Sequence, residues 1–361
     1  MPNNNTEYNS IVIQSKHFVL KASFGIENWL RSHDVSLAFS TYQSGKLLFV
    51  GLDSKQQSLS VYERNFARCM GLCLNEEKNR LLTTTLYQIW QLNNVTSPGE
   101  NYKGHDKVYV PQLAFTTGKV SGHDIAWYNN RPLFVNTLFN CLATTSNTHS
   151  FIPLWKPEFI SELVPEDRCH LNGLAMRDGK PYVVTSISRS NSRGGWRKKE
   201  NRQNGGVVID VASNEIVAQG LSMPHSPRFY KGKIWLLNSG KGEFGYLNKS
   251  EFIQVAKCPG YLRGLTFVDN YAIVGLSRPR GSTAFQDLVL DDLLPSLGGE
   301  CCGLQVIDTQ SGEIVHSLII EGVVKELYDV ITIPGSICPL LVGFESDEIE
   351  RMITIGPAAT L

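Results

Sequence analysis

Residues 122–136 read Gly-His-Asp-Ile-Ala-Trp-Tyr-Asn-Asn-Arg-Pro-Leu-Phe-Val-Asn, a polar opening followed by two apolar runs on either side of a turn. Aromatic and β-branched residues in runs of this length favour strands. The Asn-Asn-Arg segment between them suits a tight hairpin. The stretch therefore predicts a β-hairpin whose first strand starts on a histidine, His123.

The same pattern recurs along most of the chain. Its second strands follow turns such as Asp178-Gly179 and Lys231-Gly232. The repeats are about 48 residues apart on average, the length of a four-stranded propeller blade with its loops. The predicted first strands start near Ser36, Arg68, His123, His170, His225, Arg263 and Glu326.

Third and fourth strands of a blade are visible in two places, at residues 206–218 and 303–317. We therefore predict one closed all-β domain, a single β-propeller with seven blades favoured and six as the alternative. The alternative folds are an open all-β sandwich pair and two smaller barrels. The expected boundaries are an N-terminal segment with a short helix at 1–34, the propeller at 35–356 and a tail at 357–361.

The composition bounds the possible partners. The 361 residues carry 34 Lys and Arg against 34 Asp and Glu, so bulk charge gives no attraction for nucleic acid or an anionic membrane. No apolar run is long enough for a transmembrane helix, and the N-terminus lacks the features of a secretory signal. The eight cysteines are scattered, which favours reduced thiols and a cytoplasmic location. A small-molecule or peptide substrate is expected, and a protein partner is possible.

Three consecutive repeats open on a histidine, and equivalent positions of a repeat lie at equivalent places in space. His123, His170 and His225 are therefore predicted to converge at one mouth of the channel and to bind a divalent transition metal, Zn, Fe or Cu. The alternative is that these histidines have only a structural role and form hydrogen bonds at the strand ends. Without a metal, the same ring of residues can carry out acid–base chemistry.

Other polar residues are predicted at the same mouth. Glu326 is expected to be a ligand or general base, and Arg263 and Arg68 to hold a substrate carboxylate. Asp124, Asn172 and Glu345 are candidates to orient the imidazole rings. The further substrate-binding candidates in the strands are Asp124, Asn172, Asn238 and Arg228.

Two long insertions are predicted on that same face, at residues 187–203 and 277–299. Loops of this length are often lids over a site. The first insertion is strongly basic, which suits an anionic substrate, although a solvated loop has the same composition. Its candidate substrate-binding residues are Arg193 and Arg197. Arg278 is the candidate in the second insertion, in which a helix is predicted at 287–297.

Four motifs resemble those of a bacterial family of conserved hypothetical proteins, from about Trp29 to Ile355. They are Ser121-Gly122-His123-Asp124, Cys169-His170-Leu171-Asn172-Gly173-Leu174, Met223-Pro224-His225-Ser226-Pro227-Arg228 and Leu262-Arg263-Gly264-Leu265. That family carries a domain of unknown function, sometimes fused to tetratricopeptide repeats. The resemblance implies a propeller-like fold and no established activity. A looser likeness is to gluconolactonase, strictosidine-synthase and peptidyl-amide lyase propellers, and it implies a metal in the channel mouth.

Two functions follow. The first is a metal-dependent lyase, hydrolase or isomerase acting on a small anionic or peptide-derived substrate at the histidine-lined mouth. The second is a non-catalytic interaction module whose rim binds a protein or peptide, because the propeller fold serves both purposes. The predicted anchors of the second function are Trp155, Trp196 and Phe285.

Overall fold

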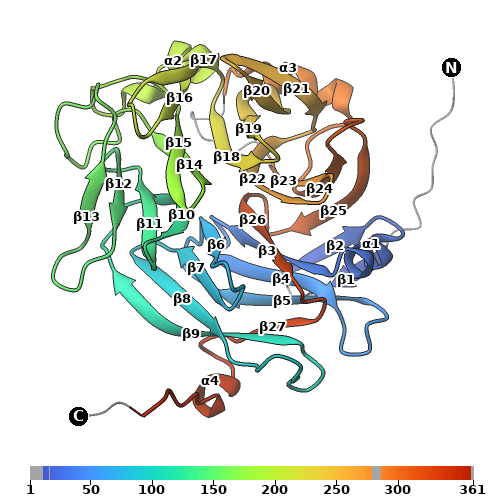
Figure 1. Cartoon of the computed structure of the whole chain (residues 1–361). Coiled ribbons are helices and arrows are strands. Elements are labelled where there is room, and N and C mark those ends of the chain that lie inside the picture. The colour runs from blue at the N-terminus through green and yellow to red at the C-terminus, as the bar shows by residue number, and fades with distance from the viewer. Residues whose placement is uncertain (1–10, 16, 279–285, 359–361) are drawn as a thin grey trace, which may run out of the picture.

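The protein folds as a six-bladed β-propeller (Figure 1). The computed structural model describes residues 11–15, 17–278 and 286–358. Three blades each consist of four consecutive strands. These strands are β10 (Gly122–Tyr128), β11 (Arg131–Asn136), β12 (Cys141–Thr144), β13 (Ile152–Trp155), β14 (Leu171–Arg177), β15 (Lys180–Ser186), β16 (Gly206–Asp210), β17 (Ile216–Leu221), β18 (Pro224–Tyr230), β19 (Lys233–Asn238), β20 (Glu243–Asn248) and β21 (Glu251–Lys257).

The other three blades combine distant parts of the chain. One joins β26 (Leu327–Pro334) to β3 (Val35–Thr41), β4 (Lys46–Leu52) and β5 (Leu59–Asn65). The next contains β6 (Leu72–Leu74), β7 (Arg80–Thr84), β8 (Gln88–Asn94), β9 (Lys107–Thr116) and β27 (Pro339–Leu341). The last contains β22 (Tyr261–Val268), β23 (Tyr271–Ser277), β24 (Gly303–Asp308), β25 (Ile314–Gly322), β2 (Phe18–Ala22) and β1 (Ile11–Gln14).

The favoured count of seven blades is wrong, and the alternative of six is correct, because the first and last repeats belong to one blade. β26 pairs antiparallel with β3, so the strand near Ser36 is the second strand of its blade and not an inner strand. β27 does not pair with β26 but runs parallel to β9 at the outer edge of the neighbouring blade. The N- and C-terminal parts of the chain thus close the ring together (Figure 1).

The N-terminal segment, predicted to precede the propeller, is part of a blade. β2 pairs along its whole length with β25, and β1 pairs with β2. The expected short helix is present as α1 (Ile26–Ser32), and its Ile26, Trp29 and Leu30 are buried in the core between two blades. After β27 the chain continues to the short helix α4 (Glu348–Arg351).

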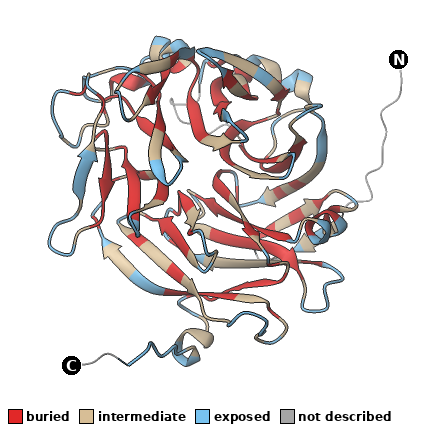
Figure 2. Ribbon diagram, in the orientation of Figure 1, coloured by how far each residue is buried: buried red, intermediate tan, exposed pale blue. Residues whose placement is uncertain are grey.

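Burial follows the inner and middle strands of the blades, and the outer strands are more exposed (Figure 2). Apolar side chains from adjacent blades form the core clusters, as in the group around Phe49, Phe66 and Tyr109. No helix among the described residues is long and apolar enough to cross a membrane.

One arginine ties the inner strands together in the channel. Arg228 on β18 pairs with Asp124 on β10 at 2.8 Å and with Asp329 on β26 at 3.3 Å. Its guanidinium also donates to the carbonyls of Leu174 on β14 and Leu265 on β22. The sixth inner strand joins through Asp329, which accepts from the backbone N–H of Leu72 on β6. Every inner strand therefore contacts this network (the Arg228 network: Arg228, Asp124 and Asp329).

Candidate functional site

The candidate site lies at the mouth of the channel where the inner strands start. His123 follows Gly122, which pairs with Asn136, and His225 follows Pro224, which pairs with Asn238. The two histidines thus occupy the same register in β10 and β18. The corresponding place in β14 is held by Asn172, because Leu171 pairs with Ser186.

His170 is not in the register that the sequence suggested. It precedes β14 by one residue and has a left-handed backbone, with φ of 55°. Its imidazole nevertheless reaches the same site, since its ring centroid lies 4.8 Å from that of His123. The indole of Trp196 covers the other side, with ring centroids 4.0 Å apart. The rings of His123 and His170 therefore lie side by side, although His170 precedes its strand and His123 lies within its own.

The Nδ1 atom of each histidine contacts an oxygen. The partners are the carbonyl of Ser121 for His123 (2.8 Å), the carboxylate of Asp167 for His170 (3.0 Å) and the carbonyl of Met223 for His225 (2.7 Å). A carbonyl or an ionised carboxylate only accepts, so each Nδ1 carries the proton. A ring held in this way has an unprotonated Nε2 whenever it is neutral. Ligands to metals and general bases are commonly held in this way.

The Nε2 atoms have different surroundings. The side-chain amide of Asn172 lies 3.1 Å from Nε2 of His225 and donates to it. No hydrogen bond is formed by Nε2 of His123 or His170 within the part of the chain that the structure describes. These two nitrogens are the ones available to a ligand.

An arginine, a glutamate and a tyrosine complete the site. Arg263 is buried and pairs with Glu326 at 2.9 Å, and its guanidinium lies 4.9 Å from the ring centroid of Tyr328. The Tyr328 ring is also 5.5 Å from that of His123. We call this group the histidine mouth, comprising His123, His170, His225, Arg263, Glu326 and Tyr328.

Arg68 lies at the edge of the histidine mouth. Its exposed guanidinium is 5.6 Å from the ring centroid of Tyr42, which is in turn 6.0 Å from that of Tyr328. Arg263 therefore lies beside the histidines, whereas Arg68 is linked to them only through Tyr42 and Tyr328.

Burial and neighbouring positive charge keep two of the histidines neutral. Burial lowers the pKa of His123 well below its ordinary value, and His170 and Arg263 lower it further. Burial also lowers the pKa of His225, with Arg263 as the next cause. Burial by itself raises the pKa of Asp167, but its interactions with His170 and Trp196 outweigh this effect and leave the pKa below its usual value.

The low pKa of His225 predicts a pH-dependent stability. The unfolded chain binds a proton below about pH 6.5 that the folded chain rejects, so the free energy of unfolding falls as the pH is lowered. A fully suppressed protonation corresponds to about 2 kcal/mol at pH 5. We expect His225→Asn to remove that part of the loss between pH 7 and pH 5, measured by urea unfolding. His149→Asn on an exposed loop is the control, and equal slopes in wild type and His225→Asn would refute the assignment.

The two insertions form a single lid next to the histidine mouth. The first contains η1 (Gly195–Arg197) and α2 (Lys199–Asn204), and the second contains α3 (Val289–Leu293) and η4 (Leu294–Leu297). Trp196 of the first packs with Leu288, Leu290 and Leu294 of the second in one buried cluster. The side chain of Gln203 also donates to the carbonyl of Asp287. The predicted second helix lies within this lid.

Asp167 connects the lid to the histidines. Its carboxylate accepts from the indole N–H of Trp196 at 2.8 Å and contacts His170, and Arg197 lies 3.5 Å away. The guanidinium of Arg197 also stacks on Trp196 at 4.4 Å. Asp167 was not among the predicted site residues. Its place three positions before His170 was the available signal.

Several predicted site residues form structural contacts within the propeller. Asp124 and Arg228 belong to the Arg228 network, and their polar atoms are used inside the channel. Asn238 is buried, accepts from the backbone of Ser222 and donates to Glu243, so it holds a turn. Their role in substrate binding stays a prediction, because the alternation of a strand does not show which polar residues face each other across the channel.

Three further predicted site residues form no hydrogen bond or ion pair with the histidine mouth among the described residues. Glu345 follows β27 and lines a pocket at the outer edge of the propeller, since β27 joins a different blade from the one predicted. Arg278 lies close enough to Cys301 and Cys302 to lower the pKa of both thiols, against the larger raising effect of burial. Arg193 is exposed on the first insertion.

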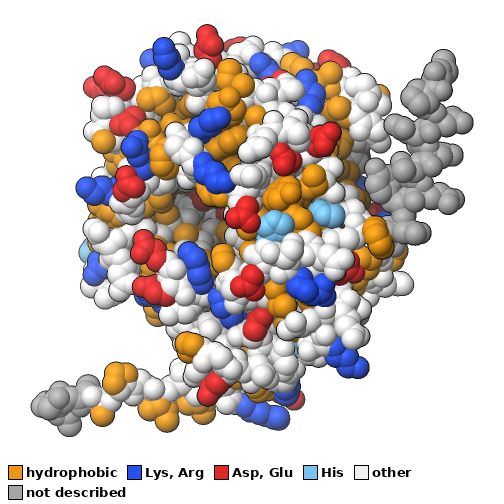
Figure 3. Space-filling view, turned by 45° about the vertical axis from the view of Figure 1, so that its right-hand side comes forward, with side chains coloured by type: hydrophobic (Ala, Val, Ile, Leu, Met, Phe, Trp, Pro, Cys, Tyr) orange, Lys and Arg blue, Asp and Glu red, His pale blue; other side chains and the backbone are white. Residues whose placement is uncertain are grey.

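The predicted surface anchors also differ from expectation. Trp196 is only 4% exposed, because it is packed in the lid and not displayed on the rim. Trp155 on β13 is half-buried, and Phe285 lies outside the described residues. Figure 3 shows basic and acidic side chains interspersed over the visible face, in keeping with the zero net charge.

The donor set fits a metal only in part. Unprotonated Nε2 atoms with anchored Nδ1 atoms suit a divalent transition metal. However, Nε2 of His225 already accepts from Asn172, and no group of three His, Cys, Asp or Glu within residues 11–15, 17–278 and 286–358 is arranged to hold an ion. The divalent metal at this mouth stays a prediction.

Several solved structures align with most of this chain at low sequence identity. A chain from the nidogen–laminin complex aligns with a TM-score of 0.53 and 10% identity, over 83% of this chain and 99% of that one. A gluconolactonase from Xanthomonas campestris aligns with a TM-score of 0.45 and 9% identity, over 81% and 87% of the two chains. Virginiamycin B lyase from Staphylococcus aureus gives 0.37 and 10% identity, over 86% and 93%.

No curated protein matches the sequence. The sequence profile of a domain of unknown function, DUF4915, matches residues 25–342. That range runs from the start of α1 to just past the last strand and includes every residue of the histidine mouth. The propeller and its histidine mouth are thus those of a member of the DUF4915 family.

Proposed function

We propose that this protein is an enzyme, a lyase, hydrolase or isomerase, that acts on a small anionic molecule at the histidine mouth. The observation that supports this most is the pair of unprotonated Nε2 atoms, on His123 and His170, placed beside a buried arginine. An imidazole with Nδ1 anchored and Nε2 unbonded is the form in which a histidine acts as a base.

The proposed step is the removal of a proton from a carbon or from water. His170 takes the proton on Nε2, and Asp167 at 3.0 Å stabilises the imidazolium that results and keeps the ring in its tautomer. Arg263 and Arg68 hold the carboxylate or phosphate of the substrate. Glu326 positions Arg263. The lid excludes water when it closes over the mouth.

The experiment that tests this function is a binding screen with a defined library of small carboxylic acids and phosphate monoesters, read by thermal shift. The proposal expects a subset of these anions to raise the melting temperature of the wild type and not of His170→Gln or Arg263→Met. Neutral analogues of the hits are the matched control. Anions that stabilise wild type and variants equally, or none that stabilises the wild type, would refute the site.

The lid offers a matched pair of arginines. Arg197→Met removes a cation from Asp167 and Trp196, whereas Arg193→Met removes one from an exposed place on the same insertion. We expect Arg197→Met to weaken binding of the anionic hits about tenfold and Arg193→Met to leave it within about twofold. Titration calorimetry measures both. Equal effects would mean that only the summed charge of the insertion matters.

The predicted divalent metal is a separate part of the proposal. His123 and His170 would hold it, and His225 would join them only if Asn172 released its Nε2. A bound metal would polarise a carbonyl or acidify water. We expect elemental analysis of protein purified without chelators to find one metal per chain in the wild type and none in His170→Ala. Metal-free wild type would rule out the metal and leave the acid–base proposal in place.

We also propose that the protein works in a reducing, cytoplasmic setting. All eight cysteines are free, and burial raises the pKa of Cys69 and Cys169 to about 12, which keeps them as inert thiols.

A further inference from the structure

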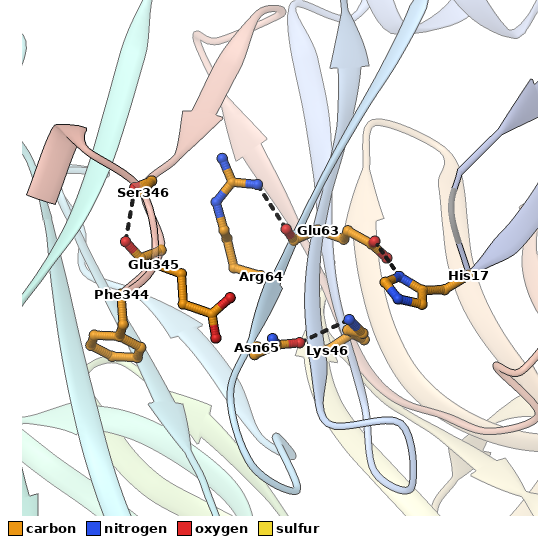
Figure 4. A pocket seen from close by; sticks show the side chains of 9 residues that line it. His17, Lys46, Glu63, Arg64, Asn65, Phe344, Glu345 and Ser346 are labelled. Atoms are coloured by element: carbon orange, nitrogen blue, oxygen red, sulfur yellow. Dashed lines mark hydrogen bonds and ion pairs between the residues drawn. The ribbon is translucent and has the colours of Figure 1, made fainter.

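A second cavity lies at the outer edge of the propeller, away from the histidine mouth. It has a volume of about 380 Å³ and is bounded on one side by the end of β5 and on the other by residues 343–346, which follow β27 (Figure 4). The two sides belong to neighbouring blades. A cavity of this size suits a small ligand.

Two basic side chains line this cavity, Arg64 and Lys46, and the ammonium group of Lys46 donates to the side chain of Asn65. The guanidinium of Arg64 donates to the backbone carbonyl of Glu63 at 2.8 Å, and its Nε is buried without a hydrogen bond among the described residues. Its stem crosses Gly343 so closely that a Cβ at that position would lie 2.3 Å from Cδ of Arg64. The glycine thus makes room for an arginine that forms no ion pair among the described residues, although Glu348 and Glu63 lie close enough to raise its pKa against the larger lowering effect of burial.

The acidic groups lie nearby. Glu345 is exposed, points across the cavity toward β5 and forms no hydrogen bond or ion pair among the described residues (Figure 4). Glu63 uses Oε1 for His17 at 2.9 Å, while its Oε2 is buried without a partner in the part of the chain described. A ligand with only negative charge would be repelled by these two carboxylates.

The phenyl side chain of Phe344 also lines the cavity. Phe344 is 45% exposed, and its ring lies 4.7 Å from that of Trp90 and 5.2 Å from that of Phe66. Packing against two other rings fixes the position of this exposed phenylalanine, and an apolar side chain of a ligand can pack on it.

We propose that this cavity binds a zwitterion, an α-amino acid with an apolar side chain. Arg64 would take the carboxylate, Glu345 and Glu63 the ammonium group, and Phe344 the side chain. The site is independent of the histidine mouth, so this proposal does not rest on the proposed enzyme function.

Titration calorimetry with L-phenylalanine as the probe tests the proposal. We expect saturable binding to the full-length wild type, weakened at least tenfold for N-acetyl-L-phenylalanine and for L-phenylalaninamide, because each lacks one charge. Glu345→Gln should weaken binding of L-phenylalanine by a similar factor, and this exposed residue leaves the fold intact. Arg64→Met is a second variant, and Asp347→Asn, two residues after Glu345, is the control.

The outcomes separate clearly. Binding that is lost with either blocked analogue and in Glu345→Gln, but kept in Asp347→Asn and in His170→Ala, supports the proposal. Binding of N-acetyl-L-phenylalanine as tight as that of the free amino acid would mean a carboxylate site and would overturn it. No binding of L-phenylalanine at concentrations of about 10 mM would overturn it as well.

Discussion

Arg228→Met should lower the free energy of unfolding by about 3–5 kcal/mol, since it leaves two buried carboxylates without a cation. Asp124 and Asp329 are 4% and 3% exposed, and both contact the guanidinium. Burial raises the pKa of Asp329 to about 7 even with Arg228 beside it. The same guanidinium links the inner strands, so the loss should appear as a lower midpoint in urea with an unchanged slope.

A second variant shows whether charge or packing is responsible. Arg228→Met combined with Asp329→Asn removes one of the two uncompensated carboxylates and should recover a part of the loss, on the order of 1–2 kcal/mol. If Arg228→Met costs less than about 1 kcal/mol, the Arg228 network does not hold the ring closed.

Asp167→Asn should lower turnover of the substrate by about 10²–10⁴-fold while leaving KM within a few-fold. An amide at this position can donate to Nδ1 of His170 and thereby favour the wrong tautomer, with the proton on Nε2. The ring would then stay in place but would no longer accept a proton. The measurement is steady-state kinetics on the anion that the binding screen identifies.

The tautomer argument has its own control. His170→Gln removes the base itself and should give a loss at least as large, and the double variant should be no worse than His170→Gln alone, because the two residues act as one unit. Additive losses in the double variant would contradict the proposed pairing. Unfolding measurements on the same variants separate a lost base from a lost fold.

The repeat and its hairpins could be predicted from the sequence because alternation and turn residues act locally. The strands and turn around His123 lie as expected. The blade count could not be predicted in the same way. The pairing of β26 with β3 joins residues about 290 positions apart, and nothing local in Val35–Thr41 states that its partner comes from the end of the chain.

The histidine mouth was predictable in composition but not in geometry. The polar residue at the start of an inner strand is visible in the sequence, and His123, Arg263 and Glu326 were found in this way. Whether such a residue faces the mouth or the channel depends on a bulge at the strand start, as between Gly122 and Ile125. That bulge turns Asp124 inward toward Arg228.

The lid shows the same limit. The length and basic character of residues 187–203 predicted an insertion that acts as a lid over the site. The structure adds that Trp196 and Asp167, far apart in the sequence, meet at His170. Such a contact depends on tertiary packing, which a single sequence does not reveal.

Nitrogen-15 NMR of the histidine side chains tests the central claim most directly, because it reports which ring nitrogen carries the proton. The account predicts the Nδ1–H tautomer for His123, His170 and His225 at pH 7, and it predicts that the Nε2 signals of His123 and His170 shift when an anionic hit is added, whereas that of His149 does not. Protons on Nε2 of these rings, or signals of His123 and His170 that ignore every bound anion, would contradict it.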